Sequence, residues 1–136
     1  MPFIRTNVPH HMPATSRQAV VQGIHDALVQ SIGMPVDELF NMVASYQPED
    51  FACSRTFNGV NRSADVVVVE ITLRRGRSDA MKRALYELIA RNLHTGAGVS
   101  PSDVLIFMHE NDYSDWSVGE GRFAMELAQN RGTAAR

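Results

Sequence analysis

A chain of 136 residues, 44% of them hydrophobic and 21% charged, is long enough for one soluble globular domain with its own core. Its net charge of -2 argues against nucleic-acid binding, which usually shows a basic excess, and no apolar run approaches the roughly 20 residues that cross a bilayer. The first residues also lack the basic and apolar regions of a signal peptide. We therefore expect a cytoplasmic protein that binds neither nucleic acid nor membrane.

The first half of the chain predicts a strand, a helix and a second strand. Residues 3–8 alternate apolar and polar side chains, as a short strand does. Ser16 is a good N-cap for a helix whose apolar residues recur at helical spacing, and Gly33 with Pro35 marks its end. Residues 39–46 then read as the second strand.

The second half of the chain predicts the same order of elements. A polar connection comes first, with a short strand pair at about residues 51–57. Residues 65–75 hold four consecutive valines, and such a β-branched run is typical of a central parallel strand buried on both faces. Ser78 caps a second helix that ends at residues 96–98, and a fourth strand follows at residues 104–108.

The two halves form an internal repeat, in which Pro35-Val36-Asp37 after the first helix is answered by Pro101-Ser102-Asp103 after the second. We predict a single α/β (α+β) domain over residues 1–136, with a four-stranded mixed sheet and both helices on one face. The other face would be bare, so we expect self-association to cover it. The domain is divided into a first βαβ unit at about residues 2–47, a second at about residues 65–109 and a C-terminal tail at about residues 110–136, weakly helical over residues 122–129.

Pro2 is the first candidate for chemistry. Removal of Met1 would leave a free secondary amine at Pro2, and α-amino groups titrate near neutrality, with a pKa of roughly 7.7–8.0. Such an amine can act as an acid or as a base. The plain alternative is that Pro2 only starts an edge strand, where proline is tolerated.

Charged residues at two predicted strand ends are the other candidates. Arg75 and Arg77 stand two apart at the end of the third predicted strand, so their side chains would leave the same face and form a fork for a carboxylate. Glu38 precedes the second strand and is a candidate proton relay. The plain alternatives are a solvated strand end for the arginines and a surface acid for Glu38. The sequence has no set of His, Cys and carboxylate residues with metal-ligand spacing.

Several segments together resemble the tautomerase superfamily, and its malonate semialdehyde decarboxylase branch fits best. They add to Pro2 and to the tandem repeat, and they match that branch in order and spacing. The segments are Gly33-Met34-Pro35, Asn61-Arg62-Ser63-Ala64, Arg75-Gly76-Arg77-Ser78, Ser100-Pro101-Ser102-Asp103-Val104, Glu110-Asn111 and Asp115–Arg122. The Trp-Ser-x-Gly-x-Gly-Arg pattern in the last of them is the most specific.

The resemblance implies a homotrimer with active sites near subunit boundaries and with no need of a cofactor or a metal. It makes Pro2 the catalytic acid or base, and it makes Arg75 and Arg77 the pair that binds a small carboxylate substrate. Gly76 stands where the family has a proline between the two arginines.

The remaining family positions depart further from the family pattern. The family's catalytic aspartate falls on Glu38, with the neighbouring Asp37 as the competing assignment. Trp116 keeps the tryptophan of the family's apolar, substrate-binding wall. Two aromatic positions of that wall are Val118 and Met125 in this chain, which predicts a differently shaped pocket.

The activity that the resemblance implies is decarboxylation of malonate semialdehyde or a similar small 3-oxo acid. A keto–enol tautomerase or hydratase acting on a 2-oxo acid is the alternative, because a neutral Pro2 would abstract a proton where a protonated Pro2 stabilises an enolate. A non-enzymatic trimeric binding protein on the same fold is a further alternative, which the intact arginine pair disfavours.

Overall fold

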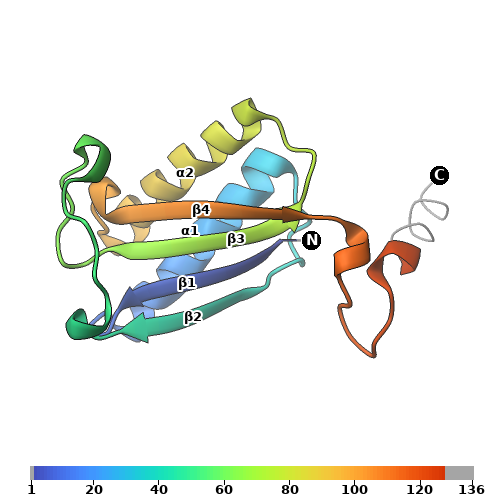
Figure 1. Ribbon diagram of the computed structural model, residues 1–136, viewed down its shortest axis with the longest axis horizontal. Coiled ribbons are helices and arrows are strands. Elements are labelled where there is room, and N and C mark those ends of the chain that lie inside the picture. Colours follow the sequence, from blue (N-terminus) through green and yellow to red (C-terminus); the bar gives the residue numbers. More distant parts are fainter. Residues whose placement is uncertain (1, 128–136) are drawn as a thin grey trace.

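Four strands form one mixed sheet, and two helices pack side by side on one of its faces (Figure 1). The computed structural model describes residues 2–127. The strands are β1 (Phe3–Pro9), β2 (Asn41–Tyr46), β3 (Val67–Arg74) and β4 (Val104–Asn111), and the helices are α1 (Ala14–Ile32) and α2 (Asp79–Ala97). The predicted order of strands and helices is confirmed.

The sheet order β2-β1-β3-β4 makes the chain a pair of βαβ units. Strand β1 runs parallel to β2 and β3 runs parallel to β4, while the two units meet in an antiparallel pairing of β1 with β3. The valine-rich strand β3 is central, but only one of its two neighbours is parallel to it. Its side chains alternate between buried and half-buried, because the helices cover one face alone. The expectation that it is buried on both faces is therefore wrong.

The core lies between the sheet and the two helices. Its fully buried side chains alternate along the strands and recur at helical spacing on the helices. The largest are Ile4, Val8, Val67, Ile71 and Leu73 from the sheet and Val20, Ile24, Leu28, Leu85, Ile89 and Leu93 from the helices. Within residues 2–127, neither helix combines the length and the apolar character that crossing a membrane requires.

The two helices differ in how they begin. At α2, the Ser78 hydroxyl accepts a hydrogen bond of 3.2 Å from a backbone N–H of the first turn, as predicted. Helix α1 begins two residues before the predicted cap Ser16, with Pro13 at the N-cap and no side-chain cap. The fixed, extended backbone of Pro13 sets that start, so Ser16 lies inside the first turn. Both helices end at a glycine with a φ of 68°, Gly33 and Gly98, as predicted.

The connection between the two units holds turns instead of the predicted strand pair. Two short 3-10 helices, Pro48–Asp50 and Phe57–Gly59, are present there. Asn58 and Gly59 have positive φ values of 57° and 74°, a conformation that makes a tight turn and interrupts a strand. In the tail, residues 124–127 are helical, and part of the helix predicted for residues 122–129 lies outside the described residues.

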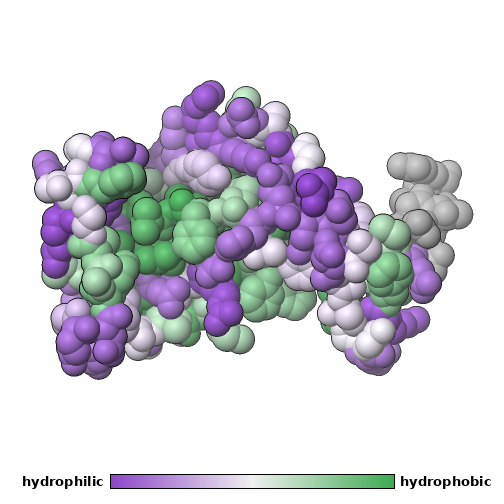
Figure 2. Space-filling model, viewed as in Figure 1, coloured by the Kyte–Doolittle hydropathy of each residue, from purple (hydrophilic) through white to green (hydrophobic). Residues whose placement is uncertain are grey.

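The sheet face that carries no helix exposes large hydrophobic side chains (Figure 2). Met42, Leu105 and Phe107 are 59%, 37% and 42% exposed. Their neighbours on this face include an ion pair in which His109 Nε2 and a carboxylate oxygen of Glu70 are 3.1 Å apart. The face is an apolar surface with polar interruptions, which agrees with the predicted bare face of the sheet.

Candidate active site

Pro2 lies where two cavities meet, at one end of the sheet. It is buried immediately before β1. It lines a polar cavity of about 650 Å³ and also an apolar cavity of about 230 Å³. The predicted catalytic residue therefore stands at the boundary between a polar and an apolar compartment.

Two segments bring charged residues to the polar cavity. The loop after α1 contributes Asp37 and Glu38, and the end of β3 and the residues after it contribute Arg74 and Arg77. Tyr113, which follows β4, lines it as well. These segments meet because β1 and β3 pair in opposite directions, which places the start of β1 beside the end of β3. The walls of the cavity thus carry both carboxylates and guanidiniums.

The two acids of the cavity belong to a tight turn. The Glu38 N–H donates a hydrogen bond of 3.1 Å to the Pro35 carbonyl oxygen, which closes a four-residue turn that includes Asp37. Two residues later, the Phe40 carbonyl oxygen accepts a hydrogen bond of 2.9 Å from the Ile4 N–H of β1. Both acids line the cavity, so the geometry allows either of them to take the place of the family aspartate.

Arg74 and Arg77 supply the guanidiniums of the polar cavity. Arg77 is half-buried, and its burial together with the nearby charge of Arg74 lowers the pKa of its guanidinium from the ordinary value. Its Nη1 donates a hydrogen bond of 3.0 Å to the Arg74 carbonyl oxygen. The Arg74 guanidinium in turn lies 4.7 Å from the centroid of the Tyr113 ring. Two neighbouring cations of this kind favour an anion between them.

Arg75, which the sequence pairs with Arg77, is not one of the residues that line this cavity. Its Nε donates a hydrogen bond of 2.8 Å to Asp112 Oδ1, and this contact raises the pKa of the Arg75 guanidinium. Strand β3 ends at Arg74 and Gly76 has a φ of 118°, so the alternation from which we inferred a shared face stops before Arg75 and Arg77. Gly76 is the signal in the sequence that could have shown this, because glycine marks a turn more often than a strand.

Aromatic side chains line the apolar cavity. Trp116 and Val118, both predicted for this wall, lie there together with Phe3 and Phe40, which the sequence reasoning missed. The Phe3 and Phe40 rings are stacked, with centroids 6.4 Å apart and an angle of 21° between the planes. Trp116 is held by a hydrogen bond of 2.7 Å from its Nε1 to Asn111 Oδ1. The two phenylalanines could have been suspected, because each stands within two residues of a predicted site residue in the sequence.

Met125 is placed differently from the other predicted wall residues. It is half-buried in the short helical stretch at residues 124–127, but it is not among the residues that line either cavity. Its neighbour Ala124 is 1% exposed, and the Ala124 N–H donates a hydrogen bond of 3.1 Å to the Trp116 carbonyl oxygen. A role for Met125 in substrate binding therefore stays a prediction.

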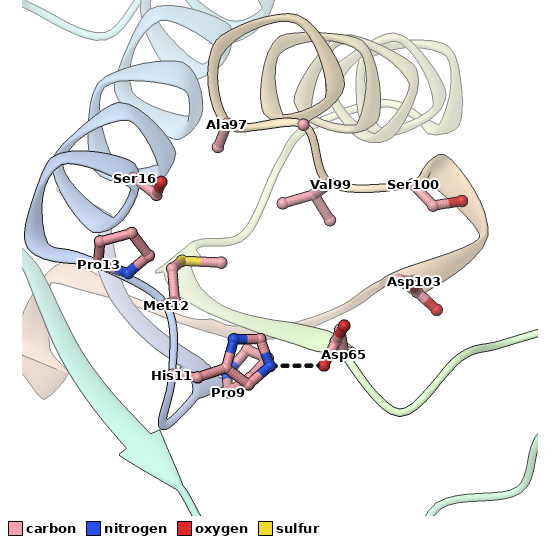
Figure 3. A pocket seen from close by; sticks show the side chains of 11 residues that line it. Pro9, His11, Met12, Pro13, Ser16, Asp65, Ala97, Val99, Ser100 and Asp103 are labelled. Carbon is pink, nitrogen blue, oxygen red and sulfur yellow. Dashed lines mark hydrogen bonds and ion pairs between the residues drawn. The ribbon is translucent and has the colours of Figure 1, made fainter.

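A further cavity of about 280 Å³ lies at the other end of β1 (Figure 3). There His11 Nε2 and Asp65 Oδ1 are 2.8 Å apart. Asp103, which is 5% exposed, accepts hydrogen bonds of 2.7 and 2.6 Å from the Ser63 N–H and hydroxyl. The charged groups of this cavity thus have partners within the fold: His11 contacts Asp65, and Asp103 contacts Ser63. Throughout residues 2–127, no group of three or more His, Cys, Asp or Glu side chains is placed to hold a metal ion.

Sequence comparisons find relatives of one kind. A family model described as tautomerase enzyme matches residues 38–119. The probable tautomerase YusQ of Bacillus subtilis (strain 168) is 30% identical over 125 residues, which is 92% of this chain and 98% of that protein. A second probable tautomerase of the same organism, YrdN, is 26% identical over 89% of this chain and 93% of its own length.

Solved structures share the fold over nearly the whole chain. The crystal structure of FG41 malonate semialdehyde decarboxylase inhibited by 3-bromopropiolate gives a TM-score of 0.87 at 28% identity, over 93% of this chain and 96% of that chain. Another malonate semialdehyde decarboxylase, whose structures address decarboxylase and hydratase activities, gives 0.86 at 27% identity, over 94% and 98%. A fused 4-OT described as a symmetric trimer shares the fold at 21% identity, with a TM-score of 0.77 over 92% and 98%.

Proposed function

Because this chain belongs to the tautomerase family, we propose that it is an enzyme that decarboxylates a small 3-oxo acid, with Pro2 as its catalytic acid after removal of Met1. The observation that carries the proposal is the place of Pro2, which lines both the cavity with guanidiniums and the cavity with aromatic walls. A 3-oxo acid needs an anion site for its carboxylate and apolar surroundings for the carbon dioxide that it releases. The similarity to two malonate semialdehyde decarboxylases supports the same reaction.

Binding of the substrate carboxylate comes first. Arg77 would hold it in the polar cavity, because a guanidinium and a carboxylate form two parallel hydrogen bonds. Two residues compete to supply the second guanidinium, Arg75 by resemblance to the family and Arg74 by its place in the cavity. A carboxylate held out of the plane of the carbonyl group aligns the bond that breaks with the orbitals that receive its electrons.

Pro2 then acts on the carbonyl oxygen. The electron pair of the carbon–carbon bond moves into an enolate as neutral carbon dioxide leaves, and a protonated Pro2 nitrogen beside the oxygen stabilises the negative charge. The Pro2 ammonium group then gives its proton to the enolate carbon, and water returns a proton to the Pro2 nitrogen. Glu38, or Asp37 beside it, would hold the ammonium group or a water molecule in place. The aromatic wall around Trp116 would keep water from the reacting bond.

A tautomerase or hydratase acting on a 2-oxo acid is the second candidate. The curated relatives are named probable tautomerases, and the same site would perform this reaction with a neutral Pro2 that abstracts a proton next to a carbonyl group. Arg74 and Arg77 disfavour a protonated amine in their vicinity, whereas Asp37 and Glu38 favour it. The balance between these charges decides which reaction dominates.

We further expect the chain to assemble as a homotrimer. The exposed hydrophobic side chains at Met42, Leu105 and Phe107 offer a surface that another copy would cover, and a fused 4-OT with this fold is described as a trimer. Sedimentation should then give three times the 15.1 kDa mass of one chain. Phe107→Asp should shift the protein toward a smaller species, and a monomeric wild-type protein would contradict the expectation.

Turnover of two substrates tests the proposed reaction. Intact mass first establishes that Met1 has been removed, and malonate semialdehyde and phenylenolpyruvate are then offered to the same preparation. We expect faster turnover of malonate semialdehyde, measured as release of carbon dioxide. A variant with Gly-Ser ahead of Pro2 should lose it, because the nitrogen becomes an amide. Faster turnover of phenylenolpyruvate would favour the tautomerase, and turnover of neither substrate, or equal turnover by the extended variant, would contradict the proposal.

A further inference from the structure

His25 is a buried imidazole for which the proposed mechanism has no use. It lies on α1 with 5% exposure, and its Nε2 is 2.7 Å from the Val36 carbonyl oxygen. A carbonyl oxygen only accepts hydrogen bonds, so Nε2 carries the proton. Nδ1 is buried and has no hydrogen-bond partner in the part of the chain that the structure describes. Burial of such a nitrogen opposes folding, and the one hydrogen bond that the ring makes in the described part of the chain is the bond to Val36.

The carbonyl group that His25 binds is the central one of the turn that carries the two acids. The Pro35 carbonyl oxygen accepts the Glu38 N–H, so Val36 and Asp37 are the middle residues of the turn. The peptide between the middle residues is the one that rotates between type I and type II turns. A rotated peptide would need a positive φ at Asp37, which Asp37 does not have. The hydrogen bond from His25 thus joins the helix to the Val36 carbonyl group in the orientation that the backbone of Asp37 allows.

The loop at the same place in the second repeat is held in another way. There Asp103, the counterpart of Asp37, is 5% exposed, and its carboxylate accepts hydrogen bonds from the Ser63 N–H and hydroxyl. In the first repeat, His25 holds the backbone of the turn from the helix, and Asp37 lines the polar cavity. The His25 hydrogen bond, which we call the clamp, thus contacts the backbone of the turn. The Asp37 carboxylate is not needed for that contact and remains at the cavity.

We propose that His25 is a positioning residue, which fixes the Val36–Asp37 peptide and thereby places Asp37 and Glu38 at the polar cavity that Pro2 lines. The inference rests on the proposed function, because the quantity that His25 controls is the placement of an acid relative to the Pro2 nitrogen. His25 itself would touch neither the substrate nor the reacting atoms. Since a shift of about 1 Å in a catalytic group can lower turnover by about 100-fold, loss of this single hydrogen bond should lower it by about tenfold.

Three substitutions separate positioning from general stability. His25→Leu removes the donor but fills the site, His25→Gln keeps an N–H at about the same distance from the backbone, and Val20→Ala weakens the buried face of α1 away from the turn. We expect His25→Leu to lower kcat about tenfold with little change in KM or melting temperature, and His25→Gln to stay within about twofold of wild type. Val20→Ala should lower the melting temperature and leave kcat unchanged.

Double-mutant cycles test whether His25 acts through the turn. His25→Leu should add little to the loss in Glu38→Gln or in Asp37→Asn, whichever acid is used, because the group that it positions is already absent. Additive losses with both acids would overturn the proposal. So would wild-type turnover in His25→Leu, or equal losses in His25→Leu and His25→Gln.

Hydrogen exchange separates a failure of this inference from a failure of the proposed function. The Glu38 amide, which is bonded to the Pro35 carbonyl oxygen, should exchange about tenfold faster in His25→Leu and at the wild-type rate in His25→Gln. If the Glu38 amide exchanges at the wild-type rate in His25→Leu, His25 does not hold the turn, even when the enzyme is active. Faster exchange would support the clamp even in a protein that turns over neither substrate.

Discussion

The polar cavity at Pro2 and the cavity at His11 occupy corresponding places in the two repeats. The first lies between the start of β1, the loop after α1 and the end of β3, and the second lies between the residues before β3, the loop after α2 and the end of β1. In the flanking loops, Asp37 corresponds to Asp103, and both loops begin at a glycine with a φ of 68°. The two loops differ beyond that glycine, because Pro101–Asp103 form a 3-10 helix that leads directly into β4, whereas Asp37 lies in a turn that ends before β2 begins at Asn41.

The two ends differ in the charged groups that line their cavities. At the cavity beside His11, His11 is bound to Asp65, and Asp103 is bound to Ser63. The two carboxylates there make contacts within the fold. At the candidate active site, two arginines share one cavity, and the pKa of the half-buried Arg77 is lowered by its burial and by the other arginine. A repeated fold thus produces two cavities in corresponding places, and the pair of neighbouring arginines, one of them with a lowered pKa, distinguishes the cavity that Pro2 lines.

Replacement of Pro2 should have the largest effect, and the far cavity provides its control. Pro2→Ala keeps an amine but loses the ring that fixes it, so kcat/KM for the preferred substrate should fall about 100-fold or more. His11→Ala, which breaks the exposed pair with Asp65, should change kcat/KM by less than about twofold. Steady-state kinetics on the two variants measure the contrast. Equal losses would remove the distinction between the two cavities.

Removal of each arginine in turn should show which guanidiniums bind the substrate. Arg77→Leu should lower kcat/KM by about 10- to 100-fold, because it removes a charge-assisted contact to the carboxylate. Arg74→Leu should have a smaller effect, and Arg75→Leu the smallest, because Arg75 is exposed and bound to Asp112. Melting temperatures control for folding. A larger loss in Arg75→Leu than in Arg74→Leu would indicate that Arg75 leaves Asp112 when substrate binds, as the family pattern implies.

The tandem repeat could be predicted because its signals are local. Alternation, helical spacing and the glycines at the helix ends depend on neighbours in the sequence, and they placed the strands and helices in the right order. The errors arose where two local signals competed. Ser16 is a good cap, but Pro13 lies earlier and already has the extended backbone of an N-cap. A short strand pair is expected at about residues 51–57 inside a segment rich in turn formers, and there the turn formers decide, because a 3-10 helix at Phe57–Gly59 includes Asn58.

The candidate site could be predicted only in part, because it joins residues that are far apart in the sequence. Pro2 and Arg77 meet at one cavity, and resemblance to a family, more than spacing, pointed to them. The choice between Arg74 and Arg75 depends on the backbone at Gly76, whose φ of 118° lies outside the geometry of a strand. Sequence periodicity describes regular elements, and this part of the site lies just after one has ended.

Removal of the buried acid at the far end should affect stability and spare activity. Asp103→Ala leaves the Ser63 N–H without its carboxylate partner, so we expect a loss of about 2 kcal/mol in the free energy of unfolding, measured by urea denaturation. Its kcat/KM should stay at the wild-type level. Asp37→Ala, at the corresponding place in the first repeat, should change stability by less than about 0.5 kcal/mol, because Asp37 is exposed. Equal destabilisation by the two substitutions would show that both carboxylates stabilise the fold.

An ion pair near the candidate site gives the smallest expected effect among the tests that compare the Pro2 cavity with the His11 cavity. Lys82 Nζ and Glu110 Oε1 are 3.0 Å apart, and this contact lowers the pKa of Glu110 and raises that of Lys82. A carboxylate whose pKa is lowered in the folded state stabilises the fold above its ordinary pKa, and that stabilisation is lost as the pH falls through the lowered value. Glu110→Gln should therefore melt about 1 °C below wild type near pH 7, and the difference should vanish in acid.

This pair lies at the same end of the sheet as Pro2, but its charges are bound to each other, as those of His11 and Asp65 are. If position alone defined the site, Glu110→Gln would lower kcat/KM as strongly as a change to the cavity arginines. If the cavity arginines define it, kcat/KM should stay within about twofold of wild type, and high salt should reduce the difference in melting temperature, because salt screens charges near the surface. A tenfold loss of kcat/KM in Glu110→Gln would therefore show that the cavity arginines alone do not distinguish the two ends of the sheet.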